Sequence, residues 1–201
     1  MDRRVKPLAA MAMLAGLMLL AGCAGGKGSR LYVLTPITVG GTAHDPDGPV
    51  IAIAAVKIPN YLDRLEVVTR SSRYRIDVND NDTWGGGLVD DVTRVLAENL
   101  SDLLATDRVT WAGSTATGFQ VAVDIVRFER DSQGVVILGA FWSVTDAANP
   151  KSQVTRHSTI VRKFDPGAKA ADGYDATVDL MSDALAGLSQ DIADAIEAFP
   201  R

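Results

Sequence analysis

Hydrophobic residues recur at two kinds of spacing along this chain, and the spacings separate predicted helices from predicted strands. Intervals of three and four residues, typical of an amphipathic helix, occur in two long runs. The first run covers residues 88–104, and the second covers residues 177–199 and stops at Pro200. The acidic side chains of both runs lie between the hydrophobic positions, so each predicted helix is expected to bury one face.

Alternating or continuous hydrophobic runs predict the strands of the first half of the chain. These strands are expected at residues 31–35, 50–56, 63–70, 74–78 and 108–111. The run at 50–56 is almost wholly apolar and β-branched, which indicates a buried central strand. Strands 63–70 and 74–78 are expected to form a hairpin that turns at Ser71 and Ser72, with a polar turn over residues 77–82.

Three further strands are expected in the second half, at residues 121–128, 135–144 and 154–164, with Gly134 in the first connecting turn. Short polar turns between them predict an antiparallel meander. The order strands, helix, strands, helix predicts an α+β fold. We expect one mixed or antiparallel sheet with the two long amphipathic helices packed on one face. The length fits a single domain over residues 31–201.

The first 30 residues have the features of a secretion and attachment signal. A short basic start precedes an uncharged apolar run, which ends in Leu20-Ala21-Gly22-Cys23. This ending resembles a bacterial lipobox, whose cysteine receives a diacylglycerol and an N-acyl chain. We expect a signal peptide at 1–22, then the lipidated cysteine and a glycine-rich tether at 23–30. The alternative is an ordinary signal peptide followed by a chance cysteine.

The net charge of the chain limits the kinds of partner that it is expected to bind. Residues 1–22 hold three of the 20 basic and one of the 25 acidic side chains, so the remainder has a net charge of −7. An acidic protein argues against nucleic acid or an anionic lipid surface as partner. Membrane attachment is therefore expected through the acyl chains. Ala24, where an Asp would resemble an inner-membrane retention signal, favours the periplasmic face of the outer membrane.

No familiar catalytic or metal-binding pattern occurs in the sequence. His44 and His157 have no cysteine or second histidine at ligand spacing. Gly85-Gly86-Gly87 lacks the Lys-Ser/Thr pair of a phosphate loop. Residues 77–82 begin like a calcium loop, but Asp82 stands where glycine is required and Leu88 where glutamate is required. We expect no enzyme activity, no metal and no cofactor beyond the lipid on Cys23.

Several segments form an ordered pattern along the chain, and one of them is long and specific. It runs Val56-Lys57-Ile58-Pro59-Asn60-Tyr61-Leu62-Asp63-Arg64 and is followed by residues 67–70. The others are Tyr32-Val33-Leu34 after the lipobox, Trp84 before the first helix, residues 123–129 with 136–142, and the C-terminal helix. This pattern resembles the PqiC-type lipoproteins, also called ABC-type transport auxiliary lipoproteins. In that family Trp84 would open the helix, but the glycines at 85–87 depart from the family pattern and leave the start of the helix open.

The resemblance implies a non-enzymatic role. Such lipoproteins are anchored in the outer membrane, face the periplasm and work with MCE-domain proteins, some driven by ABC transporter subunits, to move phospholipids between membranes. This protein would dock the MCE partner to the outer membrane and support membrane integrity, and it would form a homo-oligomer. The alternative is a structural envelope lipoprotein that scaffolds or stabilises the membrane without a transport role.

The specific segment and its surroundings supply the candidate partner-binding residues. These are Pro59, Tyr61, Leu62, Asp63, Arg64, Arg70 and Trp84. Pro59 has no backbone N–H and would interrupt a strand ladder. Tyr61 and Leu62 would then fill the core edge or form an exposed patch. Asp63 and Arg64 would cap the turn, or Arg64 would pair with Glu66. Two interpretations remain open: a structural corner between two strands, or a partner-binding edge, since aromatic and Arg side chains are enriched at interface hot spots. The interpretation of Trp84 is open in the same way, between core packing and partner binding.

Overall fold

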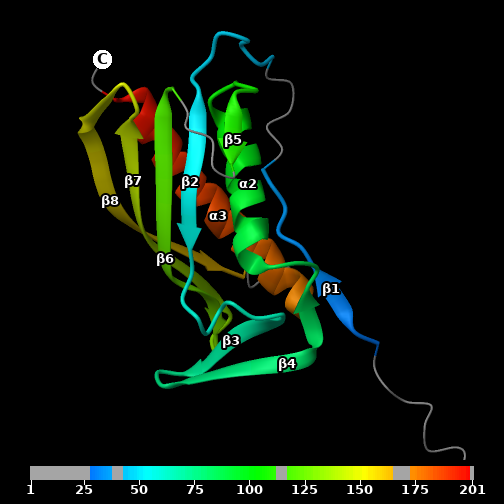
Figure 1. Cartoon of the computed structure of the whole chain (residues 1–201). Helices are drawn as coiled ribbons and strands as arrows, with labels where there is room; N and C mark the ends of the chain where they lie inside the picture. Colours follow the sequence, from blue (N-terminus) through cyan, green and yellow to red (C-terminus); the bar gives the residue numbers. More distant parts are fainter. Residues whose placement is uncertain (1–27, 38–42, 112–116, 165–172, 200–201) are drawn as a thin grey trace, which may run out of the picture.

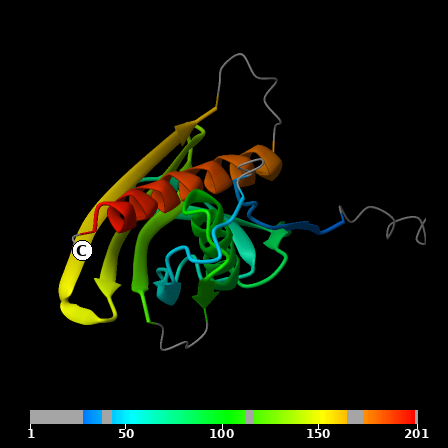
Figure 2. The same cartoon turned by 90° about the horizontal axis from the view of Figure 1, so that it is seen from above.

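The computed structural model describes residues 28–37, 43–111, 117–164 and 173–199. These residues contain one mixed sheet of eight strands and two helices. The sheet curls like half a barrel, and the helices lie in its concave side (Figures 1 and 2). The predicted α+β class is confirmed.

The strands are β1 (Arg30–Tyr32), β2 (Ile51–Lys57), β3 (Glu66–Ser72), β4 (Arg75–Trp84), β5 (Val109–Trp111), β6 (Phe119–Asp131), β7 (Val135–Asp146) and β8 (Asn149–Lys163). The helices are α2 (Leu88–Leu103) and α3 (Tyr174–Glu197). Both helices fall where the three-and-four spacing predicts them. Glycines 85–87 stay outside α2, which begins at Leu88 with Asp90 and Asp91 in its first turn. Their charges suit the positive end of the helix dipole.

Strands β6, β7 and β8 form the predicted antiparallel meander. Gly134 lies in the turn between β6 and β7 with φ of 77°, a backbone conformation that glycine adopts without steric cost. Inward-facing residues of these strands are buried against α3, and Figure 2 shows the strands curving around that helix.

The other edge of β6 is shared by two strands. β2 runs parallel to its first half, from Ile51 opposite Phe119 onward, and β3 runs parallel to its end, where Thr69 lies opposite Arg130. The intervening residues 58–65 leave the ladder in a turn, in which the carbonyl of Pro59 accepts the N–H of Leu62 at 2.9 Å. The missing N–H of proline suits this interruption. The specific sequence segment therefore connects two strands that pair with the same neighbour.

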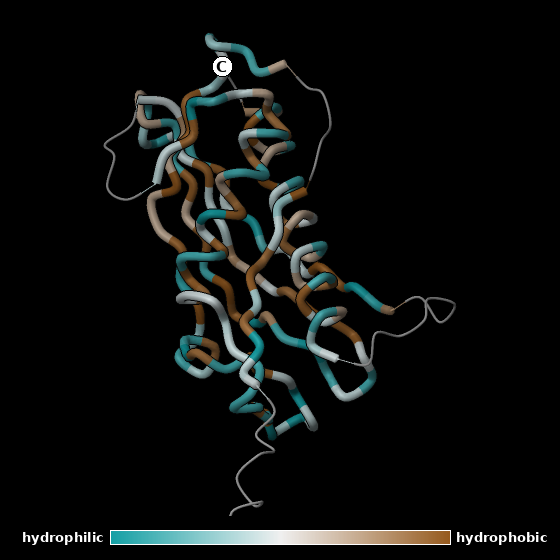
Figure 3. The backbone as a smooth tube through the Cα atoms, turned by 90° about the vertical axis from the view of Figure 1, so that its right-hand side faces the viewer, coloured by the Kyte–Doolittle hydropathy of each residue, from teal (hydrophilic) through white to brown (hydrophobic). Residues whose placement is uncertain are grey.

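The core fills the space between the sheet and the helices. Its largest fully buried side chains include Leu96, Leu100, Ile125, Phe128, Leu138, Leu185 and Leu188. Hydrophobic stretches follow the inner strands and the facing sides of the helices in Figure 3, as the sequence periodicity predicts. Two consecutive hydrogen bonds add to this packing. Trp142 Nε1 donates to Ser158 Oγ at 2.9 Å, and Ser158 Oγ donates to Asp191 of α3 at 2.6 Å.

The N-terminal segment is fastened first to the sheet and then to the helices. β1 pairs in parallel with the end of β4, and both Tyr32 Oη and Arg30 Nη2 contact the buried carboxylate of Asp82, at 3.1 and 2.6 Å. The backbone then crosses the helices, where Thr35 N donates to Ser182 Oγ and Ile37 N to Asn99 Oδ1. This departure ends β1 at Tyr32, so the predicted strand over 31–35 is too long at its end.

Three local predictions around the β3–β4 hairpin are wrong. The hairpin turns at Arg73 and Tyr74 instead of Ser71 and Ser72. Residues 77–82 belong to β4 and are no turn, and Trp84 ends that strand instead of opening a helix. The reason is that every residue from Asn79 to Thr83 is polar, so this part of β4 has no hydrophobic alternation to detect. Its pairing with β3 and β1 makes it a strand.

Candidate functional site

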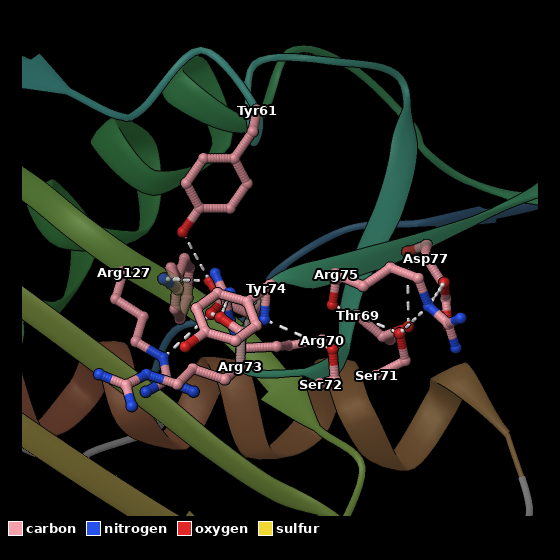
Figure 4. Close-up of polar contacts among 12 residues, drawn as sticks. Tyr61, Thr69, Arg70, Ser71, Ser72, Arg73, Tyr74, Arg75, Asp77 and Arg127 are labelled. Carbon is pink, nitrogen blue, oxygen red and sulfur yellow. Dashed lines mark hydrogen bonds and ion pairs between the residues drawn. The ribbon is translucent and has the colours of Figure 1, made fainter.

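A fully buried glutamate, Glu129, lies near the end of β6 and organises the candidate site. Its Oε1 accepts Arg70 Nε at 2.7 Å and Arg127 Nε at 2.9 Å, and its Oε2 accepts the phenol of Tyr61 at 2.9 Å. We call these four residues the Glu129 cluster. Figure 4 shows Tyr61, Arg70 and Arg127 converging on a common point with dashed contacts. Buried carboxylates require such partners because desolvation of a lone charge is costly.

The members of the cluster come from three local structures, with Glu129 and Arg127 both on β6. Tyr61 lies in the turn between β2 and β3, Arg70 on β3 beside the end of β6, and Arg127 on β6 after a register shift that follows Ile125. The pairing of β3 with β6 brings Arg70 to Glu129, although 59 residues separate them. The guanidinium of Arg70 also lies 5.8 Å from the centre of the Tyr61 ring, within cation–π range.

Burial and the contacts with Glu129 raise the pKa of two members of the cluster, Tyr61 and Arg70. Burial, followed by the negative charge of Glu129, raises the pKa of Tyr61 to about 12, so its phenol stays protonated and donates. The hydrogen bond to Glu129 raises the pKa of Arg70. Neither Tyr61 nor Arg70 is therefore poised to exchange protons near neutral pH. The arrangement therefore suits a structural and recognition role better than acid–base chemistry.

The structure separates the predicted partner-binding residues into three groups. Tyr61 and Arg70 join the Glu129 cluster, and Pro59 makes the turn that positions Tyr61. Asp63 and Arg64 are exposed, and Arg64 Nε pairs with Glu66 Oε2 at 2.7 Å, which is one of the two alternatives that the sequence left open for Arg64.

Leu62 and Trp84 are only 2% and 3% exposed and belong to the core. Both side chains are covered by the sheet and helices, which favours the core-packing alternative that the sequence left open for each of them. Cys23, the predicted lipidation residue, lies outside the described residues.

Sequence reasoning singled out neither Glu129 nor Arg127 as site residues. Glu129 does lie in the conspicuous segment 123–129, directly after the buried Phe128. A buried carboxylate requires basic partners, and Arg127 is two positions away.

Two further features of the described residues concern metals and membranes. No three His, Cys, Asp or Glu side chains gather there so as to hold a metal ion. Neither α2 nor α3 combines the length and the apolar character that a membrane-spanning helix requires. His44 instead pairs with acids: its Nδ1 lies 2.5 Å from Asp107 Oδ1 and its Nε2 3.6 Å from Asp102 Oδ1.

The fold brings together segments of the family pattern that are distant in the sequence, and comparison with known proteins identifies the family. A family model described as "ABC-type transport auxiliary lipoprotein component" matches residues 32–193. The chain belongs to this family. The predicted resemblance is confirmed, and all four residues of the Glu129 cluster lie within the matched range. The family is one of transport auxiliary lipoproteins and is not a family of enzymes.

Curated relatives and solved structures agree with this assignment. The chain is 24% identical over 183 residues to the intermembrane transport lipoprotein PqiC of Escherichia coli K12, which covers 90% of this chain and 94% of that protein. The Shigella flexneri protein of the same name matches equally. An uncharacterized protein of known structure aligns with a TM-score of 0.67 at 20% identity, covering 85% of this chain and 99% of that one. A Xanthomonas campestris structure aligns at 0.62 and 14% identity, covering 82% and 92%. These structures establish the shared fold.

Proposed function

We propose that this member of the ABC-type transport auxiliary lipoprotein family is an outer-membrane-anchored periplasmic subunit of an MCE-type intermembrane phospholipid transport system. Cys23 carries the diacylglycerol and the N-acyl chain, and the folded domain docks the MCE partner to the outer membrane. It works without enzyme activity and without a further cofactor. The observation that carries the proposal is similarity over nearly the whole length to a protein named as an intermembrane transport lipoprotein.

Surface features of the described residues support a docking role near β1. Leu31 and Leu65 are 70% and 65% exposed, and both lie at the same end of β4: Leu31 pairs with Thr83, and the carbonyl of Leu65 accepts the N–H of Trp84. The exposed pair Asp63 and Arg64 precedes Leu65 directly. Charged and apolar side chains side by side are typical of a protein-binding surface.

Site-specific photo-crosslinking in the native lipoprotein tests this proposal. A crosslinking residue is placed at Leu31 or Leu65, and a matched one at exposed Lys151 on β8, at the other edge of the sheet. In cells that express an MCE protein, we expect that protein to be captured from Leu31 and Leu65 and much less from Lys151. Failure to recover it from either leucine contradicts docking at this surface.

Membrane composition provides the second measurement. Deleting the gene is expected to alter phospholipid asymmetry of the outer membrane, and the wild-type gene is expected to restore it. An unchanged phospholipid distribution together with a weakened envelope supports the structural scaffold instead. Absence of any MCE protein from a crosslinked pull-down of the whole lipoprotein overturns the transport role altogether.

A further inference from the structure

An open hollow of about 320 Å³ lies beside the Glu129 cluster, at the tip of the β3–β4 hairpin. Three arginines and two serines line it together with one aspartate: Arg70, Arg73, Arg127, Ser72, Ser132 and Asp131. Three guanidinium groups around one hollow contrast with the acidic balance of the chain as a whole. Such a local concentration of positive charge attracts anions irrespective of the net charge.

The carboxylate of Glu129 binds two of these arginines, Arg70 and Arg127, through the Nε atom of each guanidinium group. Both Arg70 and Arg127 donate Nε to the same oxygen of Glu129. Of their outer nitrogens, Arg70 Nη1 reaches only the carbonyl of Arg73, at a long 3.4 Å. Among the described residues the outer nitrogens of Arg127 have no acceptor. The buried carboxylate thus fixes two guanidinium groups while their outer donors remain available at the hollow.

Arg73 adds a third positive charge at the hairpin turn. Its guanidinium lies 5.5 Å from the ring centre of Tyr74, which is 88% exposed, and it forms no ion pair within the described part of the chain. Figure 4 draws it near Arg70 and Arg127, whereas Arg75 points to the other side, toward Ser71 and Asp77. The hairpin therefore presents one arginine to the hollow and one away from it.

The only acid lining the hollow is already engaged. Asp131 Oδ1 accepts the backbone N–H groups of Gln133 at 2.9 Å and Val135 at 3.0 Å, which hold the β6–β7 turn. When Glu129 is counted with Asp131, the hollow and its surroundings hold three guanidinium groups and two carboxylates. The hydroxyls of Ser72 and Ser132 supply further donors.

We propose that this hollow binds a phosphate group, either on a phospholipid headgroup or on a soluble phosphate ester. Planar guanidinium groups donate pairs of parallel hydrogen bonds to phosphate oxygens, and three of them with two hydroxyls match a tetrahedral anion better than a flat carboxylate. The inference stands on the geometry of the hollow and does not depend on docking to an MCE partner.

Binding is measured by isothermal titration of the full chain in non-ionic detergent micelles at low ionic strength. One arm adds inorganic phosphate or sn-glycerol 3-phosphate, a second adds phosphatidylglycerol to the micelles, and a third adds acetate. We expect saturable binding in the first or second arm and weaker binding of acetate. Binding of phosphatidylglycerol alone identifies a lipid headgroup as the source of the phosphate. Binding in both arms shows that soluble phosphate esters bind as well.

Matched variants test the location. Arg73→Ala keeps the backbone carbonyl that Arg70 contacts, and it is expected to weaken binding about tenfold, the effect of one lost charge-assisted hydrogen bond. Arg75→Ala, on the same hairpin but facing away, should stay within about twofold. Asp131→Asn retains the acceptor for the turn and should tighten binding. No saturable binding, equal effects of the two arginine variants, or equal binding of acetate overturns the proposal.

Discussion

At the scale of single residues, the carboxylate of Glu129 depends on the side chains that donate to it. It is fully buried, and Arg70, Arg127 and Tyr61 together satisfy both its oxygens. Removing one partner of a buried ion pair is far more costly than losing an exposed pair, because the remaining charges stay desolvated. The exposed pair of Arg64 and Glu66 provides the comparison within the same chain.

Glu129→Gln is expected to lower the free energy of unfolding by about 3 kcal/mol, since two partly buried guanidinium groups lose their shared counter-charge. Glu66→Gln, which breaks the exposed pair, should cost less than about 1 kcal/mol. Urea unfolding monitored by circular dichroism measures both. Equal losses for the two variants would contradict the structural importance of the buried cluster.

His44 predicts a pH dependence. The hydrogen bond to Asp107 raises the pKa of His44 above its ordinary 6.5. The folded state therefore binds this proton more tightly than the unfolded state, and the contribution to stability is fully present below pH 6.5. It is lost as the pH rises through the folded-state pKa. Asp107→Asn should move the imidazole midpoint, measured by NMR titration, back toward 6.5; an unmoved midpoint contradicts the assignment.

At the scale of elements, polar contacts fix how α3 lies on the sheet. Ser158, buried on β8, accepts from Trp142 of β7 and donates to Asp191 of α3, so one hydroxyl joins two strands and a helix. Gly187 of α3 permits close approach, because a Cβ there would lie 3.1 Å from Ile160 Cγ2. These contacts set the position of α3 more narrowly than hydrophobic burial alone would.

Ser158→Ala is expected to destabilise the protein by about 2 kcal/mol, since it leaves a buried indole N–H without its acceptor and Asp191 without its donor. Thr159→Ala, the exposed neighbour on the same strand, serves as control and should cost less than about 1 kcal/mol. Thermal unfolding compares the two. A Ser158 variant as stable as the Thr159 variant would rule out this hydroxyl as a docking contact.

At the scale of the whole molecule, the proposed lipid anchor and the domain are connected through β1. Arg30 and Tyr32 fasten this strand to the buried Asp82 of β4, and residues 34–37 then cross the helices. The chain thus enters the domain at a fixed point. Attachment and folding are expected to be separable, because the buried core of the described residues begins at Tyr32, after the proposed tether.

Cys23→Ser is expected to abolish acylation and release or mislocalise a domain that still folds, because the acyl chains supply the membrane affinity. Membrane fractionation measures the release, and circular dichroism of the released protein checks the fold. The wild-type chain expressed at the same level is the control. Firm retention of the variant in the outer membrane contradicts anchoring through Cys23.

The sequence by itself determined the elements whose signal is local. The helices α2 and α3 and the meander β6–β8 follow from hydrophobic periodicity within short windows, since one face of each element packs on the core. The family pattern likewise named Tyr61 and Arg70 as residues of interest. What it left open was whether they form a structural corner or a binding edge.

Only the tertiary structure decided which side chains meet. Glu129 contacts Arg70 and Tyr61 across 59 and 68 residues, a pairing set by where β3 joins β6. The tertiary structure likewise buried Leu62 and Trp84, and it made a strand of the mostly polar residues 77–82. Local patterns carry no information on such long-range partners, because their contacts arise from strand pairing and from burial of charge, which involve the whole fold.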